Sequence, residues 1–182
     1  RFVHPPCCKP TRATSEAVRM ARLISNDKMH PENAPMGAEQ NALDLGLEFP
    51  DQEPGYLNLC ARTGNLLFSS GHTSDMKGKL GADLSVEQGY EAARDCAIKV
   101  LQSVHREVGS LDGLRVIKVL GCVNSTQDFT DQHLVINGCS DLLHEIFGKE
   151  GDGYHARSAL GFASLPTGPA VEVEAVFEIK GE

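Results

Sequence analysis

The sequence lacks the signatures of several common classes of site. Its six cysteines form no Cys-x-x-Cys pair and keep no regular spacing with histidine, so they predict neither a zinc site nor a disulfide framework. Gly78 and Gly81 belong to no G-x-x-x-x-G-K-[ST] phosphate-binding motif. No apolar run approaches the roughly twenty residues of a membrane helix, and no secretory signal segment is present. We therefore expect no metal, no cofactor and no membrane partner. The unpaired cysteines favour a reducing, cytoplasmic setting.

The sequence also has little positive charge. The formal net charge is -8 at pH 7, and because residues 1–28 carry a local balance of +4, about -12 remains on the rest of the chain. Nucleic-acid binding draws most of its affinity from Lys and Arg side chains on phosphates. A nucleic-acid partner is therefore not expected.

The length of 182 residues is enough for one domain with a sizeable core and an extension. We expect residues 1–36, which are rich in Pro and Asn, to form the extension, with a possible short helix at 14–24. Residues 37–182 are expected to form a single domain. The basic, amphipathic start is typical of a mitochondrial transit peptide, whereas Glu16 and the absence of an initiator Met equally favour a truncated or artificial extension.

Apolar residues at helical spacing predict the helices of the domain. A short helix is predicted at 39–47 and another at 131–147. The longest, at 85–108, begins with a capping box formed by Ser85 and Gln88.

Alternating and continuous apolar runs predict the strands. We expect a hairpin of strands at 57–61 and 66–71, and a strand at 114–123 that is buried on both faces. The runs 156–163 and 171–180 flank a Pro- and Gly-containing turn and are predicted to pair as a second hairpin. The order is strand, strand, helix, strand, helix, strand, strand, an α+β domain with helices on one face of a sheet. An uncovered sheet face would favour oligomerisation.

The last two strands carry the charged residues of most interest. Arg157 stands at the start of one strand, and Glu172, Glu174 and Glu178 alternate with apolar residues on the other. These charges are either the solvated side of a sheet or the edge of a cleft that binds a ligand. The pattern alone favours the solvated side.

Three stretches together resemble the Rid family, the YjgF-type reactive intermediate deaminases that are also labelled endoribonuclease L-PSP or translation-inhibitor proteins. They are the run RTGNLLFSSG at 62–71, the run VNSTQDF at 123–129, and the segment 156–175. The resemblance spans about residues 55–180, follows the family's order, and is to a longer branch of the family.

The resemblance implies a chorismate-mutase-like homotrimer with clefts between subunits. It also implies hydrolysis of 2-imino acids to 2-keto acids and ammonia, without a metal or a cofactor. A substrate carboxylate needs a planar cation that holds two oxygens at once, which arginine provides better than lysine.

The resemblance also assigns roles to individual residues. Arg157 falls on the family's carboxylate-binding arginine, and Glu172 falls on the glutamate that handles the attacking water. Ser70 falls on the serine at the end of a strand, beside the amide of Gly71, and both would hydrogen-bond the substrate. Asn137 falls near a family asparagine.

Two positions depart from the family pattern. Ala159 replaces a cysteine two residues after the arginine, and Leu57 replaces an active-site tyrosine, with Tyr56 one place away. His72 and His155 adjoin the motif residues and are either proton shuttles or histidines at the rim of the site.

Three functions are compatible with these residues. The first is an imine or enamine deaminase, and the second is a non-catalytic trimer that binds small carboxylates. The third is the ribonuclease or translation-inhibitor activity attached to the family name, against which the negative charge counts.

Overall fold

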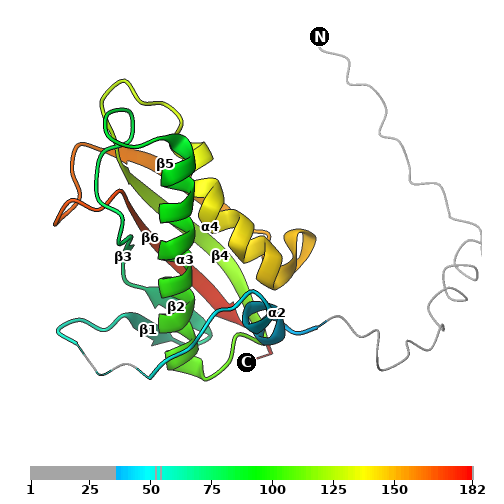
Figure 1. Ribbon diagram of the computed structural model, residues 1–182. Helices are drawn as coiled ribbons and strands as arrows, with labels where there is room; N and C mark the ends of the chain where they lie inside the picture. Colours follow the sequence, from blue (N-terminus) through cyan, green and yellow to red (C-terminus); the bar gives the residue numbers. More distant parts are fainter. Residues whose placement is uncertain (1–35, 52, 54, 182) are drawn as a thin grey trace, which may run out of the picture. The chain divides into compact units, whose positions relative to one another are not determined.

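The three-dimensional description rests on a computed structural model of the chain (Figure 1). The structure describes residues 36–51, 53 and 55–181. The possible helix at 14–24 and nearly all of the expected extension lie outside the described residues. Within those ranges, no helix combines the length and the apolar composition that a bilayer crossing requires.

The elements follow the expected order, with one extra short strand and one helical turn of π type. They are α2 (Ala38–Asp44), β1 (Cys60–Thr63), β2 (Leu66–Ser69), β3 (His72–Thr73), α3 (Val86–Val108), β4 (Leu114–Asn124), α4 (Gln132–Phe147), η2 (Gly148–Asp152), β5 (Ala156–Phe162) and β6 (Val171–Ile179).

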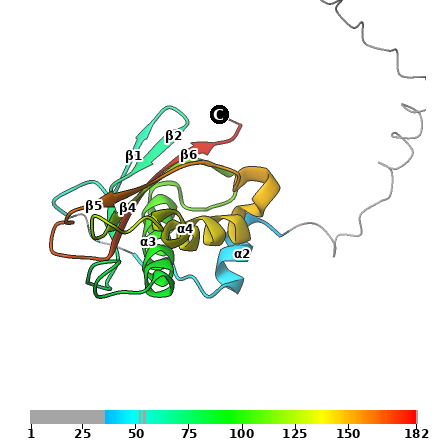
Figure 2. The ribbon, with the colours of Figure 1, turned by 90° about the horizontal axis from the view of Figure 1, so that it is seen from above.

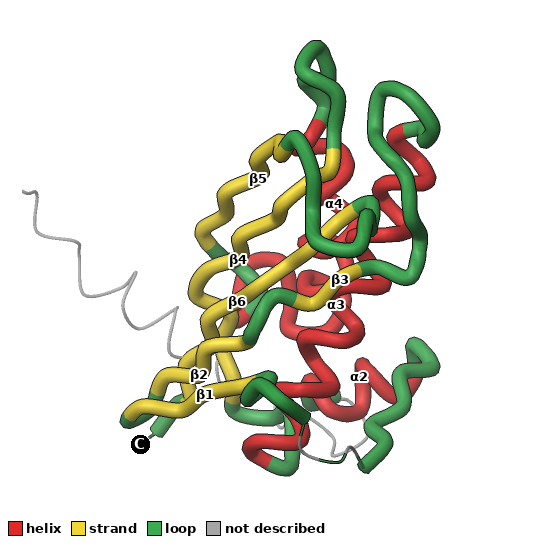
Figure 3. Tube along the Cα trace, turned by 90° about the vertical axis from the view of Figure 1, so that its left-hand side faces the viewer, coloured by secondary structure: helices red, strands yellow, loops and turns green. Residues whose placement is uncertain are grey.

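The strands form one sheet in the order β1-β2-β6-β4-β5, with β3 also beside β6. Helices α3 and α4 lie together on one side of this sheet, as the view from above shows (Figure 2). In Figure 3 the opposite face of the sheet is turned toward the viewer and no helix crosses it. The α+β class with helices on one face is therefore confirmed.

Local sequence explains the long helix α3. The hydroxyl of Ser85 accepts from the backbone N–H of Gln88 (3.3 Å), and the Gln88 side chain accepts from the Ser85 N–H (3.0 Å), which confirms the capping box. Gly109 ends the helix in the left-handed conformation. The buried stripe of α3 packs on β6, whose Val173 and Phe177 point toward the helices.

The predicted hairpin of the last two strands is wrong. Strand β4 lies between β5 and β6, and it pairs parallel with β5 and antiparallel with β6. The connecting loop crosses the end of β4, where Asn124 donates to the carbonyls of Pro169 (3.1 Å) and Ala170 (2.9 Å). The Pro and Gly residues do reverse the chain, but such local signals do not determine which strand becomes the neighbour.

The prediction that the third strand is buried on both faces is also wrong. Val116, Val119 and Val123 of β4 are buried beneath the helices, whereas Leu120 on the other face is only partly buried and Arg115 is exposed. The uncovered face carries apolar side chains, as a core-facing surface would, but no further layer of the described chain covers it. Exposed members of this face are Phe68, Leu160 and Phe162.

The close approach of α3 and α4 gives a direct test of the fold. A Cβ atom added at Gly138 of α4 would overlap the backbone carbonyl oxygen of Tyr90 in α3. Because backbone cannot move aside cheaply, Gly138→Ala should lower the free energy of unfolding in urea by about 2 kcal/mol or more. Gly55→Ala meets nothing within 4 Å and should change it by less than about 0.5 kcal/mol. Equal stabilities for the two variants would contradict this packing.

Candidate functional site

The guanidinium of Arg157 is fixed against helix α4. Its NH1 group donates to Asn137 Oδ1 (2.9 Å) and to Ser140 Oγ (3.1 Å), and its NH2 group donates to the carbonyl of His133 (3.3 Å). Positions 133, 137 and 140 share one face of α4 because residues three and four apart are neighbours on a helix. The structure thus brings the two candidate residues Asn137 and Arg157 together.

All three of these partners of Arg157 are neutral. No carboxylate of the described residues lies within ion-pair distance of its guanidinium. A guanidinium has five N–H donors, so about two remain for a ligand after the bonds to the helix. The side chain is half-buried, which weakens screening of its charge by water. The group is suited to hold an anion.

A half-buried histidine supports this arginine. The Nδ1 of His155 is 2.6 Å from the Gly153 carbonyl oxygen, which can only accept, so we assign the proton to Nδ1. Nε2 then accepts from the hydroxyl of Ser140 (3.1 Å), which in turn accepts from Arg157. Burial, together with the nearby His144 and Arg157, lowers the pKa of His155 despite the opposing bond to Gly153. Sequence reasoning missed Ser140, although its position three residues after Asn137 was a usable signal.

The candidate glutamate lies against Gly71. Strand β3 places Thr73 opposite Glu172 of β6, and a Cβ atom added at Gly71 would overlap Glu172 Oε1. A side chain at this position would displace the Glu172 carboxylate from its observed place. The structure thus places Gly71 beside Glu172, and the hydroxyl of the adjacent Ser70 donates to the carbonyl of Asn58 (2.8 Å).

A second histidine, the buried His72, orients the peptide between Ser70 and Gly71. His72 donates from Nδ1 to the Ser70 carbonyl (2.7 Å) and accepts at Nε2 from the hydroxyl of Ser103 in α3 (2.6 Å). Because the peptide is trans, the N–H of Gly71 points away from the imidazole of His72. That N–H has no hydrogen-bond partner among the described residues and is free to bind a ligand.

Both ring nitrogens of His72 and of His155 are therefore occupied within the chain. Proton shuttling by either ring would first have to break one of these bonds. In the structure, the two histidines position backbone and side-chain groups of the site through these hydrogen bonds.

Arg157 and Glu172 lie on opposite faces of the sheet. Arg157 of β5 is opposite Val119 of β4, and Val119 is opposite Ala175 of β6, so all three side chains lie on the helix face. Side chains alternate between the faces along a strand, and Glu172 is three residues from Ala175. Glu172 therefore points to the uncovered face. They are two strands apart, about 10 Å across the sheet and about 10 Å along it. The structure does not bring the two together within one chain.

The remaining candidate residues from the sequence are either exposed or packed against the core. Leu57 and Tyr56 are exposed, and Ala159 packs against the core on the helix face. Glu174 is exposed on the uncovered face, beside a hollow of about 250 Å³ in which Lys118 donates to Ser158 (2.6 Å).

Neither a thiol nucleophile nor a metal centre is evident near Glu172. Burial, aided by the carboxylates of Glu172 and Glu174, raises the pKa of Cys122 to about 11, so this thiol stays protonated near neutral pH. No group of three His, Cys, Asp or Glu side chains within the described ranges is arranged to hold a metal ion.

Comparisons with known proteins agree with this arrangement of sheet and helices. A family profile described as "YjgF/chorismate mutase-like, putative endoribonuclease" matches residues 46–173. The crystal structure of Atu1372, a protein with unknown function from Agrobacterium tumefaciens, is 37% identical and covers 78% of this chain and 91% of that one, with a TM-score of 0.69. A structure named "putative endoribonuclease" from Shewanella oneidensis is 26% identical, with 79% and 99% covered and a TM-score of 0.72.

A curated relative gives a further match. Protein TCP17 of Trypanosoma cruzi is 49% identical over 105 residues, which cover 57% of this chain and 65% of TCP17. The match therefore spans less than two thirds of that relative's length.

The fold and the length of the profile match define the class of protein. The chain belongs to the YjgF/chorismate mutase-like family, which confirms the resemblance to Rid proteins.

The buried imidazole of His72 makes a prediction about pH. Burial, reinforced by the charge of Lys99 and opposed by the bond to Ser70, lowers the pKa of His72 below 6.5 in the folded protein. The unfolded chain then takes up the proton first as the pH falls below about 6.5. The stability from neutral His72 is complete above that pH and is lost toward the lower pKa of the fold.

Urea unfolding between about pH 7.5 and pH 5 tests this expectation. His72→Asn keeps a donor at the δ position but cannot titrate, so its stability should fall less on acidification, by up to about 1.4 kcal/mol per pH unit. An identical pH dependence in the two proteins would show that His72 does not titrate differently on folding.

Proposed function

We propose that the protein hydrolyses reactive 2-imino or enamino acids to 2-keto acids and ammonia at a cleft between subunits. The observation that carries this proposal is Arg157, whose guanidinium is held by neutral oxygens and keeps donors for a substrate carboxylate.

The reaction needs an oriented water and proton transfer, but no redox step. The water oxygen forms a bond to the imine carbon while the π electrons of the C=N bond move to nitrogen, which takes up a proton. The C–N bond of the resulting carbinolamine then breaks with its electron pair on nitrogen. Ammonia leaves as the hydroxyl proton is lost and the C=O bond of the keto acid forms.

Glu172 and the residues around it would transfer the protons and hold the substrate in this reaction. The Glu172 carboxylate accepts a proton from the attacking water and returns it to the leaving nitrogen. The free N–H of Gly71 and the hydroxyl of Ser70 hold the substrate beside it. Positioning of the two reactants would provide most of the acceleration.

A second copy of the chain completes the site. Because Arg157 and Glu172 point to opposite faces, one substrate reaches both only when Arg157 of one subunit meets Glu172 of another. The exposed apolar residues Phe68, Leu160 and Phe162 on the uncovered sheet face support such an assembly, which we propose is a homotrimer.

A carboxylate-binding protein without catalysis is the second candidate. It is favoured by Leu57 and Ala159, which stand where the family resemblance has a tyrosine and a cysteine. Such a protein would use the same arginine. The endoribonuclease in the family's description would need a cationic surface, and the net charge of -8 does not favour one.

Removal of the arginine tests the proposal. Arg157→Ala should reduce ammonia release from 2-iminobutanoate, generated in situ, by about a hundredfold or more, and Arg157→Lys should restore little of it because lysine lacks the planar fork. Arg115→Ala is the control, since Arg115 is exposed and lies 4.0 Å from Glu178. Thermal stabilisation by 2-oxobutanoate without ammonia release would favour the binding protein instead.

Mixing of two inactive variants tests the shared site. Arg157→Ala and Glu172→Gln should each be inactive alone. When they are unfolded together and refolded in equal amounts, about a quarter of the interfaces in a cyclic oligomer should pair an intact Arg157 with an intact Glu172. Recovery of about a quarter of the activity is expected. No recovery in oligomers shown to be mixed would contradict a site built from two subunits.

A further inference from the structure

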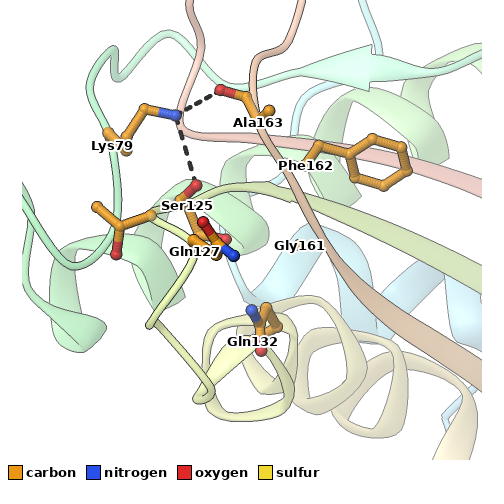
Figure 4. A pocket seen from close by; sticks show the side chains of 8 residues that line it. Lys79, Ser125, Gln127, Gln132, Gly161, Phe162 and Ala163 are labelled. Atoms are coloured by element: carbon orange, nitrogen blue, oxygen red, sulfur yellow. Dashed lines mark hydrogen bonds between the residues drawn. The ribbon is translucent and has the colours of Figure 1, made fainter.

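One pocket on the described residues is separate from the candidate catalytic residues discussed above. It has a volume of about 620 Å³ and lies at the ends of β4 and β5 (Figure 4). That volume is within the roughly 300–1,000 Å³ that small-molecule sites occupy. Arg157 lies four residues before Gly161, which lines the pocket, and is therefore about 13 Å away along β5.

One cation and no carboxylate line this pocket. The Nζ of Lys79 donates to Ala163 O (2.6 Å) and Asn124 Oδ1 (2.8 Å), and more weakly to Ser125 O at 3.4 Å. The nearby Asp83 carboxylate accepts from the backbone N–H of Lys79 and not from Nζ. The lysine is held in place by neutral oxygens, so its charge is not cancelled by an ion pair.

The hydroxyl of Ser125 has no partner. Ser125 is only 5% exposed, and none of the hydrogen bonds of the described residues uses its Oγ. No fully enclosed side-chain oxygen or nitrogen lacks a partner, so this Oγ must open into the pocket that Ser125 lines. This hydroxyl is therefore available to hydrogen-bond a ligand that enters the pocket.

The start of helix α4 borders the pocket. Gln132, the first residue of α4, lines the pocket from below (Figure 4), and it follows the N-cap residue Asp131, whose side chain makes no capping hydrogen bond. The Asp131 carboxylate offsets the partial positive charge of the helix N-terminus, so the attraction for an anion comes from Lys79. Gly161 leaves the space open, because a Cβ there would stand 2.7 Å from both Ser125 Oγ and Gln132 Nε2.

From these features we infer that the pocket is a second binding site, which takes a small phosphate-bearing molecule. The phosphate lies between Lys79 and the hydroxyl of Ser125, and the organic part occupies the rest of the pocket. Lysine as a point charge and a hydroxyl donor are each typical of phosphate binding. The site needs no glycine-rich loop of the nucleotide-binding type, and it does not depend on the proposed deaminase chemistry.

Calorimetric titration of the full chain with glycerol 3-phosphate, at constant ionic strength, tests the inference. Binding is expected for the native protein and should weaken at least about tenfold in Ser125→Ala. The melting temperature of Ser125→Ala should equal or exceed that of the native protein, because the hydroxyl has no protein partner to lose. Gly161→Ala should also weaken binding by filling the space.

Ser74→Ala is the matched control. Ser74 is also 5% exposed, but its hydroxyl donates to Met76 O (2.9 Å) and accepts from the Val171 N–H (3.3 Å). This variant should melt at a lower temperature and bind glycerol 3-phosphate as the native protein does.

Four results would overturn the inference. They are no binding by the native protein, equal binding by Ser125→Ala, loss of binding in Arg157→Ala, and binding of pyruvate as tight as that of glycerol 3-phosphate. The third would place the anion at the proposed deaminase site. Loss of deaminase activity with intact phosphate binding would count only against the proposed function.

Discussion

The alternation of side chains across the pleated sheet determines what one copy of this chain can do. Because β4 lies between β5 and β6, the register fixes Arg157 on the helix face and Glu172 on the uncovered face. Rotamer changes cannot bring side chains on opposite faces of a sheet to one small substrate. In the proposed site, the carboxylate-binding part and the water-handling part would therefore come from different subunits. The apolar uncovered face provides a physical reason for subunits to associate.

The cations of the domain fall into two groups according to their partners. Arg94 pairs with Glu145 (2.7 Å), and Lys99 pairs with Asp75 (2.8 Å) and Asp95 (2.9 Å). Such pairs near the surface contribute little stability and leave little net charge. Arg157 and Lys79 instead have only neutral partners, although acidic side chains outnumber basic ones in this chain. A cation that is positioned but not neutralised favours an anion from outside the chain.

Features encoded by near neighbours could be predicted from the sequence. Helix α3 was predictable because its cap, its apolar stripe and its final glycine are all local. The pairing of β5 with β4 was not, because a turn determines where the chain reverses and not which strand it meets. Arg157 and Asn137 were found through family resemblance. The unpartnered hydroxyl of Ser125 depends on contacts from Gly161 and Lys79, at least 36 residues away in sequence, and no local pattern reports it.

Two histidines hold the two halves of the proposed site in the same way. Each donates from Nδ1 to the carbonyl two residues earlier and accepts at Nε2 from a helix serine, His72 with Ser103 and His155 with Ser140. Only neutral imidazole offers a donor and an acceptor on opposite sides of one rigid ring. A lysine or arginine there would have no acceptor for the serine and would add a buried charge. Burial therefore suits both functions of the imidazole, because it lowers the pKa and keeps the ring in the form that makes both bonds.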